Sequence, residues 1–238
     1  MRRFYEKNPV WFAVILIVLY CVVNAPIKGN YGMGSVQLLL TMAAFALGIT
    51  LFVKIFHVEK KHGLTAWPKN TARYLYFIPM WILCTGNLWD GFPLVFNSTK
   101  QLYGVLTMLL IGFVEEMLFR GFLFNGLKEE EGTTKAIIIS AITFGIGHLV
   151  NLFSGQAAFH TLLQVFFAIA WGFIFTMVYH KCGCLWPCII GHGLIDAFSI
   201  ISQDTGKADM RFMIATIVGS IAYSLYLNNL KPKSGKIE

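Results

Sequence analysis

Two adjacent carboxylates and an arginine interrupt an otherwise apolar stretch of the chain, "GFVEEMLFRG" at residues 112–121. Charged side chains inside a long apolar run are costly and need partners, so they indicate a functional site. On a helix, residues four apart share a face, whereas adjacent residues diverge by about 100°. Glu116 can therefore pair with Arg120, while Glu115 faces elsewhere and is available for proton transfer. The alternative is that both glutamates belong to one buried polar network.

Two histidines and an aspartate interrupt later apolar runs. "FGIGHLV" places His148 in one run, and "IIGHGLIDAF" places His192 and Asp196 in another. His192 and Asp196 are four residues apart, so both can face one site. Glycines, which let helices approach closely, flank both histidines: Gly145, Gly147, Gly191 and Gly193.

This combination of a glutamate with two histidines favours chemistry on an activated water. A carboxylate held in an apolar site is a usable general base near neutral pH. With one histidine it can orient and deprotonate water, and a second histidine with a polar neighbour can stabilise an oxyanion. The sequence therefore predicts a hydrolase that cleaves an amide without a covalent nucleophile, since no G-x-S-x-G nucleophile elbow is present.

Zinc is the alternative for the same residues. Three protein ligands with an open position can activate water, but the H-E-x-x-H helix signature is absent. We therefore expect no metal and no cofactor. Three of the five cysteines crowd into "KCGCLWPC" at 181–188; reduced thiols are the expectation there, with a metal site as the alternative.

The composition argues against an ordinary soluble protein. Only 13% of the 238 residues are charged and 56% are hydrophobic, whereas globular domains carry about 25% charged residues. The chain is therefore predicted to be an integral membrane protein with the lipid bilayer as its surroundings. Its net charge of +7 comes from short basic clusters between apolar runs, so we expect no nucleic-acid partner.

Eight apolar runs approach the length of about 20 residues that a membrane helix needs. Lipid-exposed backbone must satisfy its hydrogen bonds internally, so the runs are predicted to be helices. They cover residues 9–26, 36–56, 73–89, 103–127, 135–152, 158–179, 184–203 and 210–229. The predicted fold is an all-α, polytopic bundle of about eight transmembrane helices. It forms a single membrane domain over 1–238, with its catalytic core at about 103–203.

The basic residues predict the orientation. With the N-terminus inside, the inner segments hold 15 of the 19 Lys and Arg residues. The outer segments hold only Lys28, Lys100, Lys207 and Arg211. The positive-inside rule then places both termini in the cytoplasm, which requires an even number of spans.

The three candidate residues are predicted to lie at comparable depth. Counted at helical rise from the cytoplasmic ends of their runs, Glu115, His148 and His192 lie roughly 18, 21 and 12 Å deep. One intramembrane site is therefore geometrically possible.

These residues resemble the motifs of the CAAX-prenyl-protease and bacteriocin-processing (CPBP, or Abi) intramembrane proteases. The family's motifs are EExxxR, FxxxH and HxxxN or HxxxD on separate membrane helices. Here they read "EEMLFR" at 115–120, "FGIGH" at 144–148 and "HGLID" at 192–196. The resemblance covers about 115–200, the second half of the membrane core.

The resemblance implies a role for each residue and the activity of a glutamic intramembrane protease. Glu115 would be the general base that activates water, and His148 would help to hold that water. His192 and Asp196 would line the oxyanion site, and the second glutamate and the arginine of the first motif would support them. An ionised Asp196 cannot donate a hydrogen bond as asparagine can, so orienting His192 is its alternative role.

Three functions stay open. The first is an intramembrane endopeptidase whose substrate, a peptide or small membrane protein, arrives from the cytoplasmic side or from lipid. Such an enzyme would serve bacteriocin or signal-peptide maturation, immunity or regulation. The second is a non-catalytic adaptor or immunity protein with the same fold. The third is a proton-coupled transporter with Glu115 and the histidines as a relay, although no matching interrupted spans indicate inverted repeats. The compact chain indicates a bacterial plasma membrane.

Overall fold

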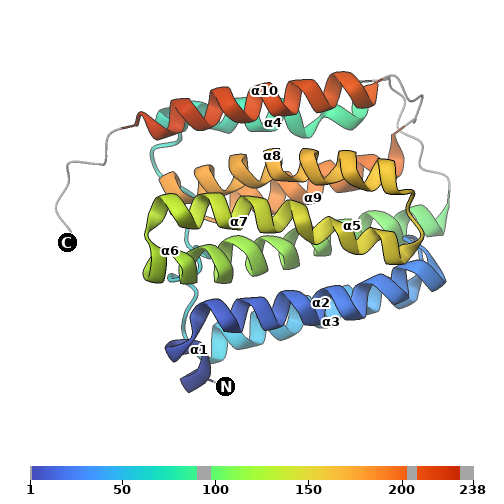
Figure 1. The fold of residues 1–238 in the computed structure, drawn as a ribbon, viewed down its shortest axis with the longest axis horizontal. Coiled ribbons are helices and arrows are strands. Elements are labelled where there is room, and N and C mark those ends of the chain that lie inside the picture. Colours follow the sequence, from blue (N-terminus) through green and yellow to red (C-terminus); the bar gives the residue numbers. More distant parts are fainter. Residues whose placement is uncertain (1, 90–97, 203–207, 231–238) are drawn as a thin grey trace.

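The computed structural model describes residues 2–89, 98–202 and 208–230, and every regular element within these ranges is helical (Figure 1). The α-helices are α1 (Arg2–Lys7), α2 (Pro9–Tyr31), α3 (Val36–Ile55), α4 (Ile78–Cys84), α5 (Thr99–Glu116), α6 (Asn125–Glu131), α7 (Thr133–Gly147), α8 (Ala158–Cys182), α9 (Trp186–Ile201) and α10 (Ala208–Asn228). Four shorter segments join them: η1 (Thr71–Phe77), η2 (Gly86–Leu88), η3 (Met117–Phe124) and η4 (His148–Ser154). The all-α prediction is confirmed.

Six helices in the described ranges are long and apolar enough to cross a membrane. They are Pro9–Tyr31, Val36–Ile55, Thr99–Glu131, Thr133–Ser154, Ala158–Cys182 and Met210–Asn228. The expected count of eight is not confirmed, because the third and seventh predicted runs form shorter helices. The helix α9 has 16 residues, and the third run is divided among η1, α4 and η2.

The break in the third run has a backbone cause. Leu75, Tyr76 and Phe77 all have positive φ, a conformation that side chains with a Cβ disfavour and that ends a right-handed helix. Pro79 then lies in the first turn of α4, where a missing N–H costs no helical hydrogen bond.

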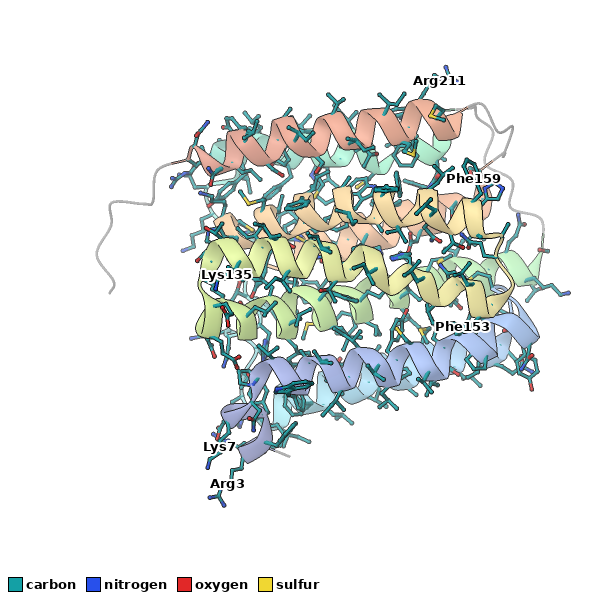
Figure 2. The ribbon with its side chains drawn as sticks, viewed as in Figure 1. Arg3, Lys7, Lys135, Phe153, Phe159 and Arg211 are labelled. Carbon is teal, nitrogen blue, oxygen red and sulfur yellow. The ribbon has the colours of Figure 1, made fainter. Side chains whose placement is uncertain are left out.

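The helices lie side by side with their axes along one direction (Figure 1). We call the end that holds α1, the α6–α7 connection and the last turn of α10 the terminal end, and the opposite end the far end. Figure 2 shows Arg3, Lys7 and Lys135 at the terminal end. Phe153, Phe159 and Arg211 lie at the far end (Figure 2). Four lysines used in the orientation argument lie outside the described residues: Lys207, Lys231, Lys233 and Lys236.

The helix that carries the paired glutamates continues from α5 through η3 to α6. Segment η3 is a π-helix, and all eight of its residues are buried. The carbonyl of Gly121 in this segment accepts hydrogen bonds from Asn125 Nδ2 (2.9 Å) and from His62 Nδ1 (2.6 Å). Because that nitrogen donates, His62 Nε2 accepts from the Tyr5 hydroxyl at 2.8 Å. The loop after α3 is thus fastened between α1 and η3.

Candidate active site

Two glycines bring the backbones of α5 and α9 together. A Cβ added to Gly112 would lie 2.6 Å from the backbone nitrogen of Gly193. A larger residue at position 112 would therefore force the two helices apart. Gly145 similarly lets α7 approach α8, because its Cβ would lie 2.8 Å from the Val165 carbonyl oxygen. Gly147 meets only ordinary contacts, with the Phe119 ring 3.5 Å away. The close approach expected from the glycines therefore occurs at some of them.

The ion pair expected from the four-residue spacing is present and completely buried. Arg120 Nη1 lies 2.7 Å from Glu116 Oε1, and both side chains have 0% exposure. The same carboxylate oxygen accepts from His192 Nδ1 at 2.9 Å. Glu116 therefore links the arginine of its own helix to the histidine of α9.

Aromatic rings enclose this pair and the histidine. The Arg120 guanidinium carbon lies 4.2 Å from the centre of the Phe144 ring. The His192 ring stacks on Phe175 with centroids 5.7 Å apart, and it meets Phe144 edge-on at 5.5 Å. These contacts fix the plane of the imidazole, so its second nitrogen points in one direction only.

That second nitrogen faces Glu115 and Asp196. His192 Nε2 lies 3.7 Å from Glu115 Oε2 and 3.4 Å from Asp196 Oδ2. The structure thus brings three of the predicted site residues together across α5 and α9. The position of Asp196 beside the imidazole suits the orienting role that the sequence left as an alternative.

Glu115 has a partner that the sequence did not indicate. The Tyr20 hydroxyl, from α2, donates a hydrogen bond of 2.6 Å to Glu115 Oε1. The second carboxylate oxygen stays directed toward His192, and the side chain is 13% exposed. Glu115 is therefore held in place yet reachable, in contrast to its fully buried neighbour.

His148 reaches the site from the junction of α7 and η4. Its Nδ1 lies 3.0 Å from the Phe144 carbonyl oxygen, and because a carbonyl only accepts, Nδ1 carries the proton. In the neutral ring Nε2 is then the acceptor. His148, Glu115 and Asp196 line the same cavity.

The cavity has a volume of about 570 Å³ and extends from these residues toward the far end. Its walls come from the second half of α2, the middle of α5, η4 and the far-end parts of α8, α9 and α10. Three exposed residues within four positions of a helix end lie on its rim: His160, Ser199 and Met210. The volume is in the range of small-ligand pockets, about 300–1,000 Å³.

Sequence reasoning missed the contribution of α2 to this cavity. Tyr20, Asn24 and Lys28 all line it, and their four-residue spacing puts them on one helix face. That spacing was a usable signal, but the expected first span ended at residue 26 and Lys28 was taken as a loop residue. The structure places Lys28 inside α2.

The described residues contain no group of three or more His, Cys, Asp or Glu side chains arranged to hold a metal ion. All five cysteines are free thiols. In the cluster at 181–188, Cys182 and Cys184 are joined by local hydrogen bonds and Cys188 donates to the Phe175 carbonyl.

Part of the chain matches a known protein family. Residues 97–198 match the family model described as type II CAAX prenyl endopeptidase Rce1-like. The matched segment runs from just before α5 into α9 and contains all the motif residues of the candidate site. No curated protein matches the chain.

Proposed function

The chain belongs to the CPBP family of CAAX-type proteases, and from this premise we propose that it is an intramembrane endopeptidase of the glutamic type. One observation carries the proposal. A carboxylate and an imidazole approach to 3.7 Å, between Glu115 Oε2 and His192 Nε2, where the wall of a cavity also holds His148.

In the proposed mechanism, Glu115 is the general base. A water between Glu115 and His148 Nε2 gives its proton to the carboxylate while its oxygen attacks the carbonyl carbon of the substrate. The resulting tetrahedral oxyanion accepts a hydrogen bond from His192 Nε2–H. Glu115 then returns the proton to the leaving nitrogen, the C–N bond breaks, and an acid and an amine are released.

The remaining side chains have positioning roles in this mechanism. Glu116 accepts from His192 Nδ1, which turns Nε2 toward the substrate, and Arg120 neutralises that buried carboxylate. Asp196, whose Oδ2 lies 3.4 Å from His192 Nε2, helps to orient the imidazole. Tyr20 donates to one oxygen of Glu115, so that the other faces the water.

We propose that the chain forms one membrane domain over 1–238, with its catalytic core at 103–203. It crosses the membrane eight times, with both termini in the cytoplasm; the two short crossings are α9 and the third run, formed by η1, α4 and η2 together. The basic residues at the terminal end support this orientation (Figure 2). Because the cavity extends to the far end, the substrate would arrive from the outer side, whereas the sequence suggested entry from the cytoplasmic side or laterally from lipid.

The proposed substrate is a peptide or small membrane-associated protein exposed on the outer face of a bacterial plasma membrane. Maturation of an exported peptide, such as a bacteriocin or signal peptide, fits a cavity open on that face. Immunity or regulation through the same cleavage fits it equally.

Comparative proteomics of cells that carry wild type, Glu115→Gln or Glu130→Gln tests the proposal. Glu130 is exposed on α6, so the last variant controls for loss of a glutamate elsewhere. At least one exported or membrane peptide should accumulate uncleaved with Glu115→Gln alone. Identical peptide processing in all three strains would refute the protease, and a phenotype preserved in Glu115→Gln would favour the adaptor.

A further inference from the structure

A partly buried lysine lies in the far-end part of the cavity. Lys28 is half-buried, and its Nζ donates to Asn151 Oδ1 at 3.0 Å. Asn151 Nδ2 in turn donates to Gln164 Oε1 at 2.8 Å, as does Gln156 Nε2 at 3.0 Å. Within the described ranges no carboxylate lies at ion-pair distance from Lys28: Glu115 and Asp196 act on it only at longer range across the cavity, and its direct partner is the neutral amide of Asn151. Such a charge favours an anionic ligand.

A second polar group on the same helix face, the Asn24 side chain, has an oxygen that receives no hydrogen bond from the described residues. Asn24 is buried, with 9% exposure, and no described group hydrogen-bonds its Oδ1 atom. It lines the cavity one turn from Lys28 toward Tyr20. A buried carbonyl oxygen without a donor is costly, and a backbone N–H of a bound peptide would satisfy it.

We propose that Lys28 and Asn24 form a subsite that binds an acidic group of the peptide substrate. Lys28 pairs with the carboxylate, and Asn24 accepts a backbone N–H beside it. A peptide fits this pair better than a lipid phosphate, because a phosphodiester has no N–H to offer Asn24. The subsite rests on the proposed function for the identity of its ligand as a substrate.

The helix also sets the distance between this subsite and the bond to be cleaved. Tyr20, which is bonded to Glu115, and Lys28 are eight residues apart on α2, or about 12 Å at helical rise. An extended peptide covers about 3.3 Å per residue, so the carboxylate lies about three or four residues from the cleaved bond. Either a C-terminal carboxylate or an Asp or Glu side chain can supply it.

A protection experiment on a native thiol tests the subsite without requiring cleavage. Cys21 lines the cavity and follows Tyr20 on α2. Alkylation of Cys21 would be followed by mass spectrometry in Glu115→Gln protein in lipid nanodiscs. The probes are N-acetyl-tetra-alanine as the free acid, the same peptide as an amide, and N-acetyl-Ala-Ala-Ala-Glu amide. Cys182, on the last turn of α8, is the internal control, and its alkylation should be unaffected.

The free acid should protect Cys21 at concentrations about 10- to 100-fold lower than the amide, the range expected for one charged hydrogen bond. If the glutamyl amide protects Cys21 as well as the free acid does, the subsite also binds a side-chain carboxylate. If it protects less well, the subsite is specific for the C-terminal carboxylate of the peptide. Lys28→Met should remove the preference for the acid, and Lys28→Arg should retain it. Lys100→Met, a change at an exposed lysine outside this cavity, should have no effect.

Equal protection by the acid and the amide, or a preference that survives in Lys28→Met, would overturn the subsite. Stronger protection by dihexanoyl phosphatidylglycerol, lost in Lys28→Met, would assign the lysine to a lipid phosphate and also overturn it. Because protection needs no catalysis, these results stand apart from the proteomic test: the subsite can hold even if no peptide is found to be cleaved.

Discussion

Removing one partner of the buried ion pair should destabilise the protein more than removing both. In Arg120→Met the Glu116 carboxylate loses its 2.7 Å contact with the guanidinium and keeps only the imidazole at 2.9 Å. Removal of one partner of a buried ion pair costs about 3–5 kcal/mol, and the hydrogen bond from His192 leaves Glu116 only partly compensated. The lost contact of the guanidinium with the Phe144 ring, 4.2 Å away, adds about 1–2 kcal/mol.

The double variant Glu116→Leu/Arg120→Met removes both charges of the pair, so no unpaired buried carboxylate remains. Apolar side chains of similar volume in place of a buried ion pair are often neutral or stabilising, although His192 Nδ1 then lacks its acceptor, at a cost of about 1–3 kcal/mol. We therefore expect the double variant to be more stable than Arg120→Met by about 2 kcal/mol.

Unfolding by SDS in mixed micelles, followed by circular dichroism, measures these differences for wild type, Glu116→Leu, Arg120→Met and the double variant. Peptide cleavage should be lost in the double variant even where stability returns, because His192 is no longer oriented from its Nδ1 side. If the destabilisation of the double variant equals the sum of the two single-variant values within about 0.5 kcal/mol, the buried-pair reasoning is refuted. Retained cleavage in the double variant would refute the role of Glu116 in orienting His192.

Three further predictions concern pH, access and packing. Burial lowers the pKa of His62 from 6.5 to about 4, so its stabilising contribution is complete above pH 6.5 and is lost as pH falls toward 4. The free energy of unfolding should be about 2 kcal/mol lower at pH 5 than at pH 7.5, and His62→Gln should reduce this difference. On intact cells a membrane-impermeant thiol reagent should label Cys21 but not Cys182, and the reverse pattern would place the cavity mouth in the cytoplasm. Gly112→Ala should destabilise the protein and abolish cleavage, whereas Gly48→Ala, with no atom within 4 Å of the added Cβ, should do neither; equal effects would contradict the close helix crossing.

The parts of the site that could be predicted from the sequence are those that depend on the spacing of residues within one apolar run. The Glu116–Arg120 contact and the approach of His192 to Asp196 both follow from four-residue separation on one helix. The low content of charged residues and the long apolar runs are likewise sufficient to predict an all-helical membrane protein. Each of these inferences depends only on residues close together in the sequence.

Contacts between distant segments were out of reach for the same reason. Tyr20 lies 95 residues from Glu115, and a tyrosine in an apolar span is equally at home facing lipid or a neighbouring helix. The break before Pro79 depends on positive φ at residues with no sequence preference for it. The fastening of His62 to Gly121 depends on a π-helix that no local pattern indicated.

The depth of a residue, counted along one helix, also could not predict which end of the bundle is closely packed and which contains the cavity. Glu115 lies at the middle of the 33-residue helix Thr99–Glu131. On its terminal-end side every residue from Met117 to Phe124 is buried, while the cavity occupies the far-end side. Among the described residues, the cavity therefore offers water and substrate a route to the carboxylate from the far end. If Glu115 is the general base, the side of the membrane on which cleavage occurs is decided by this packing, and the orientation of the chain becomes part of its specificity.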